Sequence, residues 1–265
     1  MLQKVTRPIG RRLHGLSDAA RRLGAGRGEA GDYWGRTDGA DWKLNSHWRD
    51  SPLPDWAATW DEIGLRHLAM YERFARSYEL DEPARIVEWG VGGGANAVRF
   101  APLAREFVAV DVVQASLDET ARQVRDVCGV PVRPVLVDID APSAGVADLE
   151  GEVDLFLCFY VLELVPGEQH AHEIIRLAAT MLRPGGAAVI QTKYARSAPK
   201  PRPWAGFSSD LANSYIVSVP EFWQFLGASG LDVHYVELVP RDLLDRHYAY
   251  YFVTSRGHAK DGTGR

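Results

Sequence analysis

From Arg85 onward, short apolar segments alternate with amphipathic ones, and this alternation constrains the fold of the 265-residue chain more than any other feature. Such alternation is typical of a layered α/β sheet. The last two strand-like segments are joined only by residues 240–245, a link too short for a crossover helix, so we expect them to pair antiparallel. The sequence therefore predicts a three-layer α/β fold, with seven strands that are mostly parallel and end in an antiparallel hairpin. The expected strands are residues 85–90, 106–111, 131–138, 152–160, 187–194, 231–239 and 246–255.

Composition and charge limit the class of protein. Hydrophobic residues make up 46% of the chain and charged residues 25%, as in globular proteins with a sizeable core. The whole chain has a net charge of −5. Residues 1–30 carry +5, so residues 31–265 carry −10, which argues against nucleic acid as a partner. No apolar run is long enough to cross a bilayer, and no secretory signal follows the basic N-terminus. Cys128 and Cys158 make neither a disulfide framework nor a metal cluster, so we expect a cytoplasmic protein.

The N-terminal 30 residues are predicted to be a basic helical extension. Apolar side chains recur at helical spacing over residues 3–24, with arginines on the other flank and glycines after the last turn. One interpretation is a helix that packs on the body of the protein or on a second copy in a homodimer. The alternative is peripheral contact of residues 1–28 with an anionic membrane surface. The apolar residues are small and few, which favours the first interpretation.

Residues 31–80 are interpreted as an aromatic-rich cap segment followed by a helix over 55–78. Aromatic side chains in the helix face are expected in the core, whereas polar and aromatic groups of the preceding loop more often line a pocket. Residues 81–256 are the main domain. Within it, residues 195–217 form an insertion with an arginine-aromatic mixture that suits a lid, and residues 257–265 are expected to be a disordered tail.

The stretch IVEWGVGGGANAV, residues 86–98, places four glycines directly after the first strand. Glycine lets the backbone turn sharply or lets another group come close. Gly90, Gly92 and Ala95 satisfy the dinucleotide fingerprint G-x-G-x-x-G/A, which would indicate a nicotinamide or flavin enzyme. Three features argue against that class. Glu88 would repel a pyrophosphate, no sizeable separate catalytic domain flanks the sheet, and the sheet ends in an antiparallel pair.

Together these residues resemble the class I S-adenosylmethionine-dependent methyltransferases, from the first strand to the last. Glu88-x-Gly90-x-Gly92-x-Gly94 is similar to the glycine loop of that family, and Asp111 stands where the family has its ribose-binding acid, 23 residues after Glu88. The turn LRPGG before the fifth strand is also similar. The resemblance implies a Rossmann-like sheet, methyltransferase activity and S-adenosylmethionine as the cofactor.

The cofactor site that the resemblance implies agrees with simple chemistry. A carboxylate attracts the cationic amino group of the cofactor, and a second carboxylate can accept both ribose hydroxyls. Asp138, at the end of the third strand, stands where the family places an acid or amide near the adenine amino group. The expected cofactor-binding residues are Glu88, Gly90, Gly92, Gly94, Asp111, Val112, Asp138 and Phe159.

Methyl transfer to a hydroxyl also needs a group that takes the proton. The segment YVLELVP after the fourth strand resembles the family's, but Leu164 stands where a histidine is common, which excludes an imidazole base there. The candidate catalytic residues are Tyr160, Glu163, Lys193 and His47, and the candidate substrate-binding residues are Tyr194, Trp48 and Trp204. No sequence pattern predicts a metal site. His170 and His172 are two apart, so they are expected on different faces of a helix, both at the surface.

The acceptor is less constrained than the cofactor. Aromatic faces beside arginine suit a small-molecule or saccharide acceptor, so we expect O-methylation of a hydroxyl. N-methylation of a small amine is the alternative, because it needs no strong base. A third hypothesis is a regulatory subunit that keeps the cofactor fold without catalysis, and the intact acidic and glycine positions argue against it.

Overall fold

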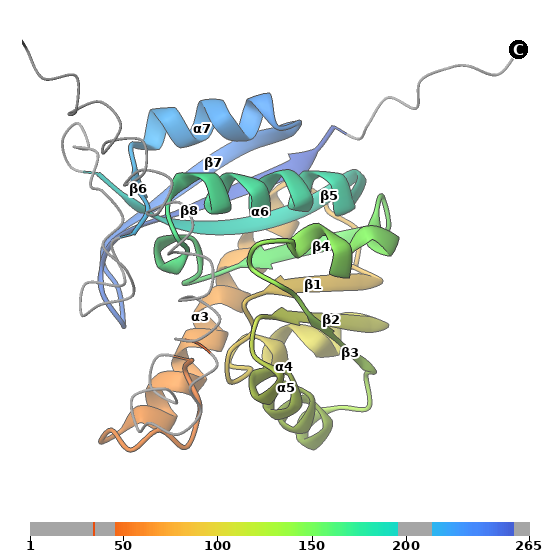
Figure 1. Ribbon diagram of the computed structural model, residues 1–265, viewed down its shortest axis with the longest axis vertical. Coiled ribbons are helices and arrows are strands. Elements are labelled where there is room, and N and C mark those ends of the chain that lie inside the picture. Colours follow the sequence, from red (N-terminus) through yellow and green to blue (C-terminus); the bar gives the residue numbers. More distant parts are fainter. Residues whose placement is uncertain (1–33, 35–45, 196–213, 257–265) are drawn as a thin grey trace, which may run out of the picture.

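The computed structural model describes Trp34 and residues 46–195 and 214–256 of the chain. The expected helix at 3–24, residues 31–33 and 35–45 of the cap segment, the insertion residues 196–213 and the expected tail at 257–265 lie outside these residues. A mixed sheet forms the centre of the described part (Figure 1).

The sheet runs in the order β3-β2-β1-β4-β5-β8-β7, and a two-residue strand, β6, pairs with β5 off this path. Strands β1 to β6 pair in parallel, whereas β8 lies antiparallel between β5 and β7. The predicted sheet with its antiparallel final hairpin is confirmed, and β6 is an eighth strand that the sequence pattern did not predict. The strands are β1 (Arg85–Trp89), β2 (Glu106–Asp111), β3 (Val132–Leu136), β4 (Val153–Cys158), β5 (Leu182–Tyr194), β6 (Ile216–Val217), β7 (Leu231–Arg241) and β8 (Arg246–Ser255).

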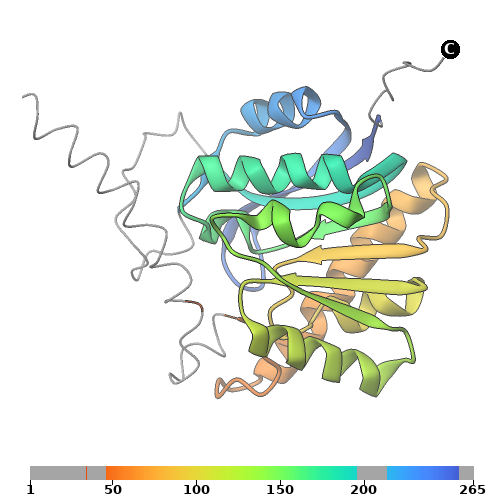
Figure 2. The ribbon, with the colours of Figure 1, turned by 45° about the vertical axis from the view of Figure 1, so that its right-hand side comes forward.

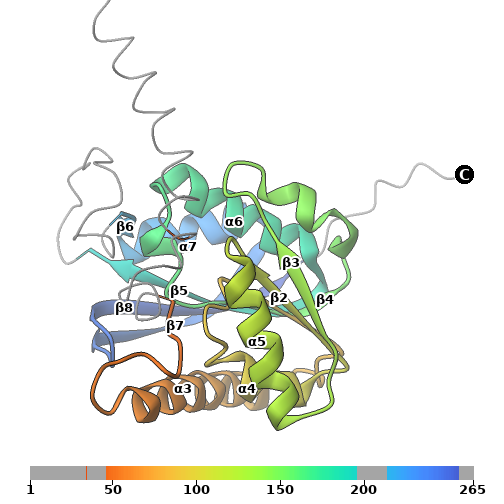
Figure 3. The same cartoon turned by 60° about the horizontal axis from the view of Figure 1, so that its bottom comes forward.

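Helices cover both faces of the sheet, α6 and α7 on one and α3, α4 and α5 on the other (Figures 2 and 3). The expected apolar stripe of α3 is buried as predicted, from Trp56 to Phe74. None of the described helices is long and apolar enough to cross a membrane. The α-helices are α3 (Trp56–Ser77), α4 (Ala97–Phe100), α5 (Gln114–Val127), α6 (Glu168–Met181) and α7 (Val219–Ala228), and the 3-10 helices are η1 (Ala101–Leu103), η2 (Pro142–Gly145), η3 (Ala147–Leu149) and η4 (Leu162–Leu164).

Two hydrophobic cores result, one on each face, because successive side chains of a strand point in opposite directions. In β4, Phe156 and Cys158 belong to the core under α6 and α7, whereas Leu155 and Leu157 belong to the core over α3 to α5. The middle of β4 is therefore apolar on both faces, as expected for a parallel strand covered on both faces.

The topology places a crevice at the carboxyl end of β1. The chain proceeds from β1 through β2 to β3 on one side, then returns to β4 on the other side of β1. Ligands of open α/β sheets bind beyond the carboxyl ends of the strands at such a switch point.

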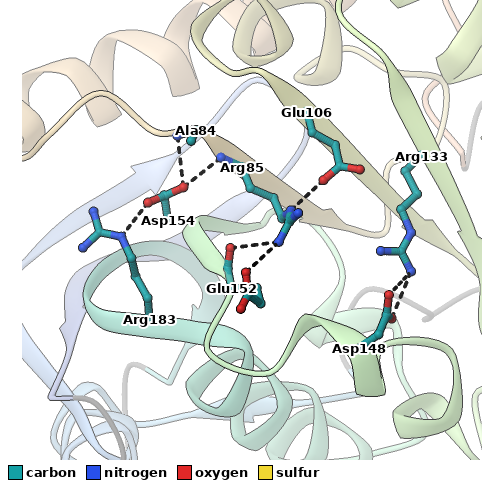
Figure 4. Close-up of polar contacts among 8 residues, drawn as sticks. All are labelled: Ala84, Arg85, Glu106, Arg133, Asp148, Glu152, Asp154 and Arg183. Carbon is teal, nitrogen blue, oxygen red and sulfur yellow. Dashed lines mark hydrogen bonds and ion pairs between the residues drawn. The ribbon is translucent and has the colours of Figure 1, made fainter.

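The amino ends of the same strands carry a network of ion pairs (Figure 4). Asp154 of β4 accepts hydrogen bonds from the backbone amides of Ala84 (3.0 Å) and Arg85 (2.8 Å) and from Arg183 Nε (2.5 Å). Arg85 Nε donates to Glu106 Oε2 (2.6 Å). Every member of this network has a partner, and the network ties β1, β2, β4 and β5 together at the end opposite the crevice.

Candidate active site

A cavity opens at the carboxyl ends of β1, β2 and β4. It is lined by eight residues that the sequence singled out and by others from the cap segment and the η2 and α6 regions. The eight are His47, Glu88, Gly90, Gly92, Asp111, Val112, Phe159 and Tyr160.

The glycine loop between β1 and α4 turns through left-handed backbone conformations, with φ of 76° at Gly90, 50° at Gly92 and 85° at Gly94. From the sequence, the space beside these glycines was expected to hold a ligand. The structure corrects that expectation for part of the loop, where other residues of the protein fill the space. A Cβ on Gly92 would lie 2.4 Å from the carbonyl oxygen of Ser46, and one on Gly93 would lie 2.5 Å from that of His47. The close approach is made by the protein's own segment 46–48, which the Gly93 amide fixes by donating to Ser46 O (2.7 Å).

Glu88, the second-last residue of β1, is a buried carboxyl group in the cavity wall, with 2% of its surface exposed. Its Oε1 accepts a hydrogen bond from Asn96 Nδ2 (2.8 Å), while its Oε2 has no hydrogen-bond partner among the described residues. Burial raises the pKa of Glu88 to about 8, and the Asn96 hydrogen bond opposes that rise. An unpaired buried carboxylate oxygen is costly, and a cationic amino group of a ligand would satisfy it.

Asp111 ends β2 on the opposite side of the glycine loop. Its Oδ2 accepts from the Gly92 amide (3.0 Å) and its Oδ1 from the Val113 amide (3.0 Å), so the carboxylate is held rigidly. Burial raises the pKa of Asp111 to about 6, and the backbone hydrogen bonds counter it. Each carboxylate oxygen has a further lone pair, so Asp111 can also accept hydrogen bonds from a vicinal diol.

Apolar groups line the cavity beyond Asp111: Val112, Val137, Ile139 and Pro142. Asp138 lies between two of them but is exposed, and its Oδ1 accepts a hydrogen bond from the Asp140 amide (2.9 Å). The cavity wall is therefore formed by the neighbours of Asp138 rather than by its carboxylate. Gly94 is also absent from the wall, because it packs against Thr120 of α5.

His47 and Tyr160 stand together in the cavity wall, with ring centroids 5.5 Å apart and an edge-to-face angle of 90°. Both have left-handed backbone conformations, φ 53° and 56°, which strain residues that have a Cβ by about 1–3 kcal/mol each. Such strain persists only where the surroundings enforce it, and it often marks functional sites. Burial lowers the pKa of His47 to about 4, so its imidazole is neutral at pH 7 and can accept a proton.

Glu163, Lys193 and Tyr194 were expected beside Tyr160 in an acceptor pocket, but none of them is among the residues that line the cavity. Glu163 is 1% exposed on η4, and burial raises its pKa to about 7. Lys193 is buried in β5, where its backbone pairs with both β6 and β8 and its Nζ forms an ion pair with Asp245. β6 and β8 therefore flank the carboxyl end of β5 on both sides. The sequence alone could not show this pairing.

Of the two candidate tryptophans, the structure describes only Trp48, which is not among the residues that line the cavity. Trp48 is half-buried, and its carbonyl oxygen accepts a hydrogen bond from Trp56 Nε1 (2.6 Å), while its neighbours Ser46 and His47 line the cavity. Trp204 lies outside the described residues.

The cavity wall also contains residues that the sequence did not assign to the site, among them Trp34, Asn96 and His170. Asn96 follows the glycine loop directly, and this position was the only sequence signal for it. His170 and His172 do face different neighbours, but both are half-buried rather than at the surface, and His172 stacks on Phe225 (3.7 Å). Within the described ranges, no three His, Cys, Asp or Glu side chains are grouped to hold a metal ion.

Comparison with protein families gives one match. Residues 86–186 match the family model described as a methyltransferase domain. The matched range begins in β1 and ends in the turn inside β5, so it contains the glycine loop, Asp111 and Tyr160. No curated protein matches the chain.

Solved structures share the fold at low sequence identity. The Burkholderia thailandensis 1,6-didemethyltoxoflavin-N1-methyltransferase, crystallised with 1,6-didemethyltoxoflavin and S-adenosylhomocysteine, is 20% identical, with a TM-score of 0.53 over 95% of this chain and 93% of that one. The N-methyltransferase NodS from Bradyrhizobium japonicum, in complex with S-adenosylhomocysteine, is 15% identical, with a TM-score of 0.52 over 72% of this chain and 86% of that one. The [4+2]-cyclase SpnF is 16% identical, with a TM-score of 0.53 over 72% of this chain and 81% of that one.

Proposed function

We propose that this chain, whose residues 86–186 match a methyltransferase domain, is a class I S-adenosylmethionine-dependent methyltransferase that methylates a hydroxyl of a small-molecule or saccharide acceptor, with His47 as the base. The observation that carries this proposal is the neutral imidazole in the cavity wall, beside Tyr160 and in the same cavity as Glu88 and Asp111.

The residues at one end of the cavity fit the cofactor. The unpaired Oε2 of Glu88 is suited to its ammonium group, Asp111 to its ribose hydroxyls, and the apolar wall beyond Val112 to its adenine. When bound, S-adenosylmethionine supplies an electrophilic methyl group on a positively charged sulfur, which leaves as a neutral thioether.

The chain then has to orient the acceptor and take its proton. The acceptor oxygen would take the methyl group in exchange for its hydroxyl proton, and His47 would accept that proton. Tyr160 holds the imidazole edge-on and presents a second polar group to the acceptor. Trp34 and Phe159 give aromatic surface against which a phenol ring or a sugar face can pack. Removal of bulk water and alignment of the two reactants supply much of the remaining rate.

Product analysis tests the acceptor class. The full-length protein would be incubated with S-adenosylmethionine labelled on its methyl group and with panels of phenols, saccharides and small amines. We expect label on phenol or sugar oxygen, and loss of that label in His47→Asn. Label only on amine nitrogen, unaffected by His47→Asn, would reject the proposal and favour the N-methylation alternative, which the names of two fold relatives also suggest.

A further inference from the structure

A series of buried contacts leads from the carboxyl group of Glu88 into the protein core. Asn96 Nδ2 donates to Glu88 Oε1 (2.8 Å), and Asn96 Oδ1 lies 2.8 Å from His67 Nδ1 of α3. His67 Nε2 lies 3.2 Å from the hydroxyl of Tyr250 on β8. Both His67 and Asn96 are buried, so water does not substitute for these contacts.

The chemistry of these groups fixes the direction of each hydrogen bond. The carbonyl oxygen of Asn96 can only accept, so the hydrogen of the neutral imidazole must lie on Nδ1 of His67. That hydrogen in turn fixes the orientation of the Asn96 amide, because the opposite orientation would place two donors together. With the amide held in this way, its NH₂ group faces Glu88 and favours the ionised carboxylate.

Three neighbours hold His67 in place: Asn96, Phe159 and Tyr250. Its ring stacks on Phe159 of the cavity wall, with centroids 4.0 Å apart and planes inclined by 12°. The Tyr250 hydroxyl that faces Nε2 has one hydrogen, which it donates to Asp242 Oδ2 (2.5 Å), and Asp242 forms an ion pair with Arg66 (2.7 Å). The imidazole therefore packs against β8 and close to the link between β7 and β8, far along the chain from the glycine loop.

We propose that His67 is a positioning residue for cofactor binding, which acts through Asn96 to favour the ionised form of Glu88 and to direct its free oxygen into the cavity. The role rests on the proposed cofactor, and it assigns to a core histidine of α3 a function in the affinity for that cofactor. His67 lies outside the cavity lining, so it acts through its neighbours, and the proposal assigns the effect to Asn96 rather than to the stacked ring of Phe159.

Two substitutions separate the two nitrogen atoms of the ring. In His67→Asn the side-chain nitrogen is bonded to Cγ, as Nδ1 is, so it can still donate to Asn96. In His67→Gln the nitrogen lies one bond further out, as Nε2 does, so it can reach Tyr250 but not Asn96. Binding of S-adenosylhomocysteine to the full-length protein, measured by calorimetry, would compare them. His234→Gln on β7, a half-buried histidine outside the cavity lining, is the matched control.

We expect His67→Asn to bind S-adenosylhomocysteine within a few-fold of wild type. His67→Gln should raise the Kd by about 10-fold to 100-fold, because it leaves a buried amide without its fixed partner. The pH profile gives a second readout. Affinity should rise with pH as Glu88 ionises, and the midpoint should move upward in His67→Gln, since the released amide can turn its carbonyl toward the carboxyl group.

The other titratable or charged groups near Glu88, Asn96 and His67 are unchanged in both variants. Asp111 on β2 and Cys158 on β4 interact electrostatically with Glu88, and His47, Asp242 and Arg66 act on His67 or its neighbours. If a His67 variant fails to fold, Asn96→Asp tests the same step, because it keeps the shape of the side chain and removes the donor to Glu88. It should raise the Kd by a similar factor.

Equal affinity of wild type and His67→Gln, with the same pH midpoint, would overturn the inference while leaving the proposed function intact. An equal loss in both His67 variants would also overturn it, because the ring would then matter only for packing. Failure of the wild type to bind S-adenosylhomocysteine would instead remove the proposed function and this inference with it.

Discussion

The two ends of the parallel strands use charged residues in opposite ways. At the amino ends, Asp154 and its arginine partners satisfy one another, and the network is partly open to water (Figure 4). At the carboxyl ends, Glu88 is buried beside a second acid, Asp111, and one of its oxygen atoms has no partner in the described residues. The first arrangement stabilises the sheet alone, whereas the second is complete only with a ligand.

The largest effect is expected from removing the proposed base. His47→Asn should lower kcat by about 10²–10⁴, because proton transfer in the transition state is lost, while the Kd for S-adenosylhomocysteine stays within a few-fold. In the wild type, kcat should fall as pH drops through the lowered pKa of about 4, since only the neutral imidazole accepts a proton. Steady-state rates over pH 4–8 and calorimetry provide the measurement. An unchanged kcat would show that His47 is not the base.

Glu88→Gln separates ligand binding from stability at the same site. We expect the Kd for S-adenosylhomocysteine to rise by about 100-fold, because a charge-assisted contact is lost. The raised pKa means that the folded protein holds a proton on Glu88 that the unfolded chain releases, so wild-type stability should fall as pH rises from 4.5 to about 8. Glu88→Gln should remove that decline. Denaturant unfolding at several pH values checks it, and a variant with lower stability throughout would contradict it.

Gly93→Ala tests the contact between the glycine loop and segment 46–48. The new Cβ would lie 2.5 Å from His47 O and 2.6 Å from Trp48 Cα, so this segment must move. We expect the free energy of unfolding to fall by about 1–3 kcal/mol, together with a loss of turnover as His47 is displaced. Gly129→Ala is the matched control, because a Cβ there meets nothing within 4 Å. Equal behaviour of the two variants would show that the close contact is unimportant.

Asp154→Asn should affect stability without affecting the site. It removes the charge that pairs with Arg183 and weakens the bonds to two backbone amides, so we expect a loss of about 1–2 kcal/mol in the free energy of unfolding. The Kd for S-adenosylhomocysteine should match wild type. A change in that Kd would mean that the amino and carboxyl ends of the strands are coupled.

Local sequence patterns predicted the helices, the strands and the acidic residues of the cofactor site, because the periodicity of apolar residues and the spacing of motifs can be read from contiguous sequence. The stripe of α3, Glu88 near the end of β1 and Asp111 at the end of β2 are of this kind. Contacts between distant segments were not predictable in the same way. The approach of Ser46 to Gly92, the burial of Lys193 between β6 and β8, and the pairing of His67 with Asn96 all depend on how separate elements pack.

The smallest effect on ligand binding should come from deleting the N-terminal residues. This deletion shows how much of the N-terminal segment the site requires. Deletion of residues 1–28 should leave the Kd for S-adenosylhomocysteine within a few-fold, because Glu88, Asp111 and the glycine loop all lie in the main domain. Deletion through Trp48 should weaken binding much more, since it removes the carbonyl that the Gly93 amide binds and the His47 part of the cavity wall. Calorimetry on both proteins, each checked for cooperative unfolding, makes the comparison. If the shorter deletion already abolishes binding, the basic extension is an integral part of the site, and the boundary at residue 30 is wrong.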